Sequence, residues 1–251
     1  MGCRTQAESS KVDLVNPKND FQKDISNQFS GFDDINCVML KQPFGIISWD
    51  RLARDRLRAS DLYDFEFIDM ILEVIRSTRR SQKIQKICNE FLESKSITHF
   101  AALHWRYDVK DWLNLNTKNQ QRTDTVGKIK SIRADPTEFS QKVIAEMKKI
   151  EATTILLFSP PSDYSFLQNL TNSLQKIQPT IQIIQEKEIA EFSQSKLDKK
   201  YFDTQLSLIS QELAFSSDFY FYSNPSTWSA NVVLERLAAN VFGERMILDF
   251  V

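Results

Sequence analysis

Residues 153–185 read TTILLFSPPSDYSFLQNLTNSLQKIQPTIQIIQ, and this stretch decides the predicted fold. The apolar run from Thr153 to Phe158 predicts a strand, residues 163–177 have the spacing of an amphipathic helix, and a second strand is predicted from Ile181 to Gln185. Pro179 separates the helix from the second strand. A helix of this length can make the right-handed crossover between parallel strands, so the stretch predicts a β-α-β unit.

The same alternation continues on both sides of this unit. Further strands are predicted at Thr98 to Trp105, Phe219 to Tyr222 and Met246 to Phe250, and further helices at residues 136–150, 203–216 and 227–240. This succession predicts an α/β fold built on a doubly wound, Rossmann-like parallel sheet, whose ligands bind beyond the carboxyl ends of the strands.

The remaining residues are assigned only to larger segments. Residues 1–35 are polar and aperiodic, which is typical of a flexible lead-in. Residues 36–251 are predicted to form the α/β domain, with 36–95 as the remnant of an interdomain or helical segment. Residues 114–132 are polar and weakly patterned, so we expect a surface excursion beside the ligand crevice.

The composition excludes several kinds of site. The chain has 251 residues but only five glycines, which are too far apart for a GxGxxG turn or a GxxxxGK[ST] phosphate loop. Its three cysteines and two histidines form no CxxC or HExxH pattern, so we expect no metal site.

The charge pattern also restricts the partners. With 32 basic and 33 acidic residues the chain has no overall field that would attract nucleic acid. Arg76, Arg79 and Arg80 lie among acidic residues, which favours solvated helix faces. No stretch approaches the roughly 18 to 20 uninterrupted apolar residues of a membrane span, so none is expected.

The first candidate site lies where the strand predicted at Thr98 to Trp105 ends. His104 and Arg106 are two residues apart, so at the end of a strand they project from the same face. A guanidinium matches a phosphate with two hydrogen bonds, and a histidine beside it can donate to the same anion. A structural arrangement, in which Arg106 pairs with Asp108 on the surface, explains the pattern equally well. His99, at the other end of the strand, is assigned a structural role.

The second candidate site is the start of the helix predicted at residues 227–240. Helix N-termini present free backbone N–H groups and partial positive charge, and Ser226, Thr227 and Ser229 add hydroxyls there. These residues favour a phosphate site that needs no glycine. Taken alone, simple capping of the helix by Ser226 or Thr227 explains them better.

Together the two segments resemble a known enzyme family. His104-x-Arg106-x-Asp108 follows an amphipathic helix, and further along come Ser217 to Phe221, Ser226 to Ala230, and Glu235-Arg236. In this order the elements resemble those of the GDP-fucose protein O-fucosyltransferases. The similarity covers about residues 64–250, and it implies the carboxyl-terminal, donor-binding half of a GT-B glycosyltransferase.

The resemblance implies an activity and a set of roles. It implies transfer of fucose from GDP-fucose to Ser or Thr hydroxyls of a protein, in the endoplasmic reticulum or Golgi lumen, without a metal or other cofactor. Arg106 matches the catalytic arginine that stabilises the leaving GDP, and His104 matches the histidine beside it. The turn that holds the diphosphate is matched by Ser226, Thr227, Trp228 and Ser229. Asp163 is assigned as a displaced substitute for the aspartate that reads guanine.

Two features depart from the family pattern. The glycine-rich Gly-Arg-Phe-Gly-Asn-Gln element of the amino-terminal domain has no counterpart in this sequence, and Ser210 replaces an acidic residue, although the matching Gln211 follows it. An alternative is therefore a catalytically silent nucleotide-sugar-binding or interaction module. A third hypothesis is an unrelated doubly wound domain with another phosphorylated ligand.

Overall fold

The structure is a computed structural model of the chain. It describes residues 4–6, 38–40, 73–107, 120–159, 163–223, 226–239 and 247–249. The chain divides into two units, Met1–Glu73 and Val74–Val251. In the first unit, β1 (Arg4–Gln6) pairs in parallel with β2 (Val38–Leu40). The division falls inside the segment 36–95 that the sequence sets apart, and most of the predicted lead-in lies outside the described residues.

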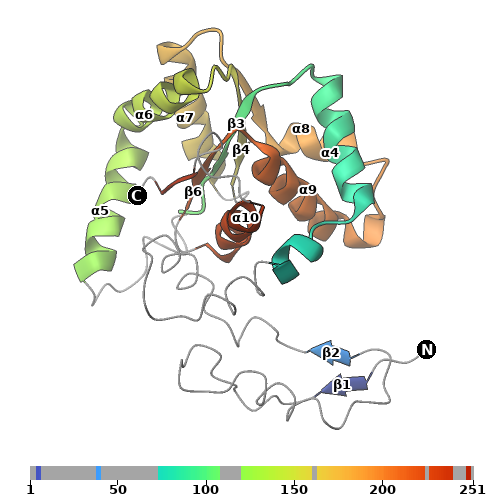
Figure 1. The fold of residues 1–251 in the computed structure, drawn as a ribbon. Coiled ribbons are helices and arrows are strands. Elements are labelled where there is room, and N and C mark those ends of the chain that lie inside the picture. Colours follow the sequence, from blue (N-terminus) through green and yellow to red (C-terminus); the bar gives the residue numbers. More distant parts are fainter. Residues whose placement is uncertain are drawn as a thin grey trace. The chain divides into compact units, whose positions relative to one another are not determined.

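The second unit is built on a five-stranded parallel sheet with the order β5-β4-β3-β6-β7 (Figure 1). The strands are β3 (Phe100–His104), β4 (Thr154–Phe158), β5 (Gln182–Gln185), β6 (Phe219–Tyr222) and β7 (Ile247–Asp249). The chain builds the sheet outward from β3 to β5, then returns to the centre and builds it outward from β6 to β7. This is the doubly wound, Rossmann-like arrangement, so the predicted fold class is confirmed.

Helices cover the sheet in two layers (Figure 1). One layer holds α5 (Gln120–Ala134), α6 (Thr137–Lys149) and α7 (Tyr164–Ile177). The other holds α4 (Gln82–Ser94), α8 (Glu186–Ser193), α9 (Phe202–Ser216) and α10 (Thr227–Ala238), with the short 3-10 helix η4 (Lys199–Tyr201) ahead of α9. The connections after β3 and β6 therefore leave toward opposite faces of the sheet.

The alternation of side chains along β3 places residues of different character on the two faces. Leu103 and Trp105 are fully buried in an apolar core with Ile129 of α5 and Leu170 of α7. His104 points to the other layer, where it contacts α10. His104, one of the predicted site residues, is thus on the α10 side of the sheet.

Two helices differ from the prediction. Residues 120–134 form α5, a mostly exposed helix that the sequence does not predict within the surface excursion expected over 114–132. The sequence gives little sign of this helix because Ile129 is its one fully buried residue among those whose side chains are described, with Ile132 partly buried against the same core and mostly polar residues around them. The short helix α8 is also missed, because Gln185 acts as its N-cap in a capping box with Glu188, whereas Ser, Thr, Asp and Asn are the usual signals.

Arg79 and Arg80 do not lie on a solvated helix face, so that expectation is wrong for them. Arg80 is 8% exposed; its Nε donates to Glu212 Oε2 at 2.6 Å and its Nη1 to Glu235 Oε1 at 2.8 Å. Arg79 Nη2 donates to Glu212 Oε1 at 2.7 Å, and its guanidinium stacks on Phe215. Burial would lower the pKa of Arg80, but Glu235 and Glu212 more than offset this and raise it. The network ties the start of α4 to α9 and α10.

Candidate functional site

The carboxyl ends of β3 and β6 lie side by side at the centre of the sheet. The chain leaves β3 toward the layer of α5, and it leaves β6 toward α10 in the opposite layer (Figure 1). Such a divergence is the topological switch point, where α/β sheets of this kind bind ligands. The structure brings the two segments singled out in the sequence, 104–106 and 226–229, to this one place.

The buried Ser223 hydroxyl holds the two strand ends together. Ser223 Oγ donates to the His104 carbonyl at 2.6 Å and accepts from the Arg106 N–H at 3.0 Å. The register, with Leu103 opposite Phe221, puts Ser223 across from Trp105. Its side chain therefore takes the two bonds that its backbone would make in a continued parallel ladder.

Because the side chain of Ser223 makes these two hydrogen bonds, its backbone is free to turn. The Ser223 carbonyl accepts from the Ser226 N–H at 3.1 Å, which starts the turn into α10. Strand β6 can thus end while the segment carrying Arg106 stays fixed. The backbone of the predicted catalytic arginine is positioned by a serine that directly follows the strand.

His104 is enclosed between β3 and α10. It is 5% exposed, its Nδ1 lies 2.7 Å from Ser229 Oγ, and its ring centroid lies 4.1 Å from that of Trp228. Burial, followed by the positive charge of Arg106, lowers its pKa from 6.5 to about 3. His104 is therefore neutral at physiological pH.

Trp228 is fixed in position from several sides. Its Nε1 donates to Ser207 Oγ of α9 at 3.0 Å, and its ring also lies against Phe158 at the end of β4. Trp228 forms a rigid half-buried surface over His104.

The start of α10 explains how the predicted diphosphate turn is arranged. Ser226 is the N-cap, and its hydroxyl accepts from the Ser229 N–H at 3.4 Å. Thr227 is exposed on the first turn, whereas Ser229 is fully buried and its hydroxyl contacts His104 and Tyr220. The four residues are close together, but the buried Ser229 hydroxyl contacts His104 Nδ1, whereas Thr227 is the most exposed of the four.

Asp163 has partners within the domain. It is 1% exposed, and its Oδ2 accepts from Trp105 Nε1 at 2.9 Å and from Arg133 Nη1 at 2.7 Å. The Arg133 guanidinium also lies over the ring of Phe166. These contacts fix the start of α7 against the end of β3. They support a structural role, and base reading by Asp163 stays a prediction.

Other members of the resembled pattern also make contacts within the fold. Arg236 is fully buried, and its Nη1 donates to the carbonyls of Ala214, Phe215 and Ser217, where a cation stabilises the end of α9. Glu235 pairs with Arg80. The adjacent residues Glu235 and Arg236 therefore join α10 to α9 and to the segment before α4.

His99 and Asp218 lie at the opposite edge of the sheet. Asp218 Oδ2 accepts from the Phe100 N–H at 3.0 Å and lies 3.4 Å from His99 Nδ1. Both residues lie at the start of β3, whereas His104 lies at its carboxyl end. The placement agrees with the structural role assigned to His99.

The sequence does not reveal the roles of three residues of this site, Ser207, Tyr220 and Ser223, although Ser223 begins the segment of the second candidate site. Tyr220 and Ser223 belong to the strand and turn that the sequence places correctly, but only the pairing with β3 shows what they contact. A serine directly after a strand that ends at a switch point is the signal that could have indicated Ser223. Ser207 carries no such signal.

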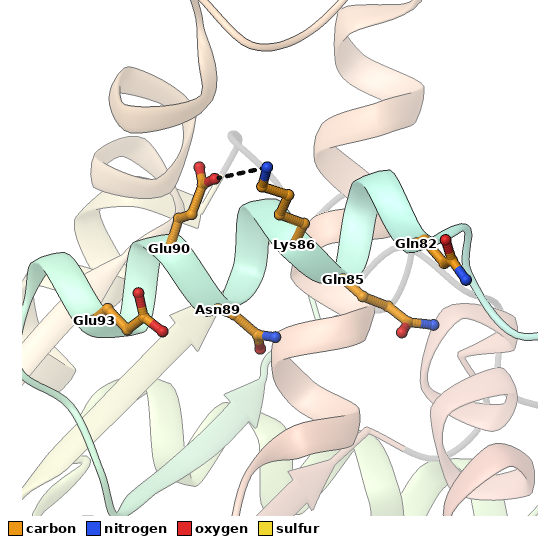
Figure 2. A pocket seen from close by; sticks show the side chains of 6 residues that line it. All are labelled: Gln82, Gln85, Lys86, Asn89, Glu90 and Glu93. Carbon is orange, nitrogen blue, oxygen red and sulfur yellow. Dashed lines mark ion pairs between the residues drawn. The ribbon is translucent and has the colours of Figure 1, made fainter.

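A polar hollow of about 480 Å³ lies elsewhere, on the outer face of α4. Figure 2 shows its six lining side chains projecting from that one helix: Gln82, Gln85, Lys86, Asn89, Glu90 and Glu93. Lys86 and Lys196 both pair with Glu90. None of the predicted site residues lines it, and its character is that of a solvated helix face.

Two further findings concern the described part of the second unit. Within it, no group of three or more His, Cys, Asp or Glu side chains is placed to hold a metal ion. Among the same residues, no helix combines the length and the apolar content needed to cross a bilayer.

No family model matches this chain. No curated protein sequence matches it either. Solved structures do align with it. Two crystal structures of POFUT1 in complex with GDP show 15% and 13% identity, with TM-scores of 0.46 and 0.48. POFUT1 in complex with GDP-fucose shows 10% identity and a TM-score of 0.47. They cover 71%, 95% and 98% of this chain, which spans 49%, 70% and 73% of theirs. The likeness is distant, and the fold assignment above depends on the strand order and the crossovers.

Proposed function

We propose that the second unit is the donor-binding half of a fucosyltransferase-like glycosyltransferase, which binds GDP-fucose and transfers fucose to Ser or Thr hydroxyls of a protein. One observation carries the proposal: Arg106, His104 and the N-terminus of α10 meet at the switch point of the sheet, held together by Ser223. A cation, a neutral imidazole and helix N–H groups form a suitable set of partners for a diphosphate.

The chemistry of transfer agrees with this set. The bond between the sugar carbon and the β-phosphate oxygen breaks, and negative charge grows on the departing diphosphate. Arg106 would stabilise this charge, since its guanidinium stays protonated and its backbone is fixed by Ser223. The partial positive charge at the start of α10 adds to this stabilisation. These groups need no metal ion for that role.

Calorimetry with the full chain tests donor binding. We expect GDP to bind more tightly than ADP and UDP, and GDP-fucose to compete with it. Binding of none of the three, or an equal affinity for all, would refute recognition of a guanine nucleotide. The second outcome would favour a doubly wound domain for another phosphorylated ligand.

A second candidate is a nucleotide-sugar-binding module that does not transfer the sugar. It is favoured by the low pKa of His104, about 3, which makes this residue a poor base toward an acceptor hydroxyl. Incubating the chain with radiolabelled GDP-fucose and mixed acceptor proteins separates the two candidates. Labelled acceptor supports the transferase, whereas GDP-fucose binding without transfer or release of fucose supports the module.

A further inference from the structure

A buried chain of hydrogen bonds runs from β6 through α10 to His104. Tyr220 Oη lies 3.1 Å from Ser229 Oγ, and Ser229 Oγ lies 2.7 Å from His104 Nδ1. Tyr220 and Ser229 are both fully buried, and His104 is nearly so. The role of Tyr220 goes beyond the proposed diphosphate contacts.

The positions of the protons follow from counting donors. Ser229 has one hydroxyl hydrogen and lies between two groups that each hold or accept a proton. If His104 Nδ1 carried the imidazole proton and donated it to Ser229, two arrangements would remain. Ser229 could donate to Tyr220, and the Tyr220 O–H would then need another acceptor. Ser229 could instead accept from both neighbours, and its own O–H would then need an acceptor other than the two partners found for it. In the described part of the chain, Ser229 Oγ is the hydrogen-bond partner found for Tyr220 Oη. Either arrangement would leave a fully buried donor unsatisfied, which native structures avoid.

The opposite direction satisfies every group. Tyr220 donates to Ser229, Ser229 donates to the lone pair on His104 Nδ1, and the imidazole proton is then on Nε2. Burial keeps Tyr220 protonated by raising the pKa of its hydroxyl, and burial together with Arg106 keeps His104 neutral by lowering its pKa. Tyr220 and His104, at the two ends of this hydrogen-bond chain, therefore keep the protonation states that this direction requires.

We propose that Tyr220 is a positioning residue, which acts through Ser229 to fix His104 as the neutral tautomer with its proton on Nε2. Fixed in this way, His104 offers an N–H donor beside Arg106 instead of a lone pair that would repel a phosphate oxygen. This role deepens the proposed function and depends on it for the identity of the bound anion. The tautomer itself does not depend on any ligand.

Nitrogen-15 NMR of the nucleotide-free full chain tests the tautomer directly, because long-range proton–nitrogen spectra distinguish the two ring nitrogens. The chain has only two histidines, and the His99→Gln variant assigns their signals. At pH 7 we expect a protonated Nε2 and an unprotonated Nδ1 for His104. We expect Tyr220→Phe to give a mixture of tautomers and a GDP affinity about fivefold weaker, as for one neutral hydrogen bond. The control Tyr201→Phe, which removes a half-exposed hydroxyl, should change neither result.

A proton on Nδ1 of His104 in the wild type, or an unchanged tautomer in Tyr220→Phe, would overturn the proposal. If Tyr220→Phe does not fold, Ser229→Ala breaks the same chain at its middle and should also give mixed tautomers. If the wild type shows the expected tautomer but binds no GDP, the proposed function fails while the role of Tyr220 in fixing His104 is still supported.

Discussion

Lowering the pH should destabilise the domain through the titration of His104. Burial and Arg106 lower the folded-state pKa of His104 to about 3, whereas an unfolded histidine titrates near 6.5. Between these values the unfolded chain binds more protons than the folded one, so stability falls as the pH decreases. Below about pH 3 both states are protonated, and this loss stops.

The size of the effect follows from the unfolded state. Between pH 7 and pH 5 an unfolded histidine goes from about one-quarter protonated to almost fully protonated, while His104 in the folded domain stays neutral. This difference corresponds to a loss of about 2 kcal/mol in the free energy of unfolding. It is a large effect beside the roughly 5–15 kcal/mol stability of a typical domain.

Urea denaturation followed by tryptophan fluorescence at pH 7, 6 and 5 measures it. Carboxylates also titrate in this range, so the quantity of interest is the difference between the wild type and His104→Asn. The wild type should lose about 2 kcal/mol more than the variant between pH 7 and pH 5. His99→Asn, a change at a largely exposed side chain, serves as the matched control. Parallel losses in the wild type and His104→Asn would refute the enclosed, neutral state of His104.

Three other substitutions give distinct outcomes. Ser223→Ala removes two buried hydrogen bonds, so we expect a loss of about 2 kcal/mol in urea denaturation and weaker GDP binding; unchanged stability would contradict the bridging role of this hydroxyl. Asp163→Asn leaves the Arg133 charge without its carboxylate partner, so the free energy of unfolding should fall by about 3 kcal/mol or more, as for a broken buried pair. Unchanged stability together with a shift in preference from GDP to another nucleotide would instead support base reading by Asp163. Gly127→Ala lies inside α5, and apart from its chain neighbours and the helix's own backbone no atom lies within 4 Å of the added methyl group. Thermal unfolding should therefore show a gain of up to about 1 kcal/mol, and a loss would contradict the helix over this residue.

The sheet could be predicted from the sequence because its strands are short apolar runs with clear boundaries. The strand predicted at Phe219 to Tyr222 has the same bounds in the structure, and the helix predicted at 163–177 differs by one residue at its start. The helix α5 could not be predicted because its three large aliphatic residues, Val126, Ile129 and Ile132, are too few among polar neighbours for a clear periodic signal. Local pattern therefore decides these elements only where several side chains share one face.

The candidate site could be predicted only in part. The carboxyl-end rule correctly brings Arg106 and the start of α10 to one place, because it depends on strand direction alone. The inward role of Ser229 depends on how α10 packs on β6, and the partners of Asp163 come from two separate elements. Spacing along the chain does not encode either contact.

The most direct test of the account is the affinity of Arg106→Ala for GDP, measured by calorimetry beside the wild type and Arg106→Lys. The account predicts that GDP binds the wild type and that Arg106→Ala binds GDP at least about 30-fold more weakly, which corresponds to about 2 kcal/mol for a charge-assisted contact. Arg106→Lys should restore only part of this affinity. The backbone N–H of residue 106 still bonds to Ser223 in both variants, so the fold is expected to persist. Equal GDP affinity in the wild type and Arg106→Ala, or no binding by the wild type, would contradict the assignment of this switch point as a donor site.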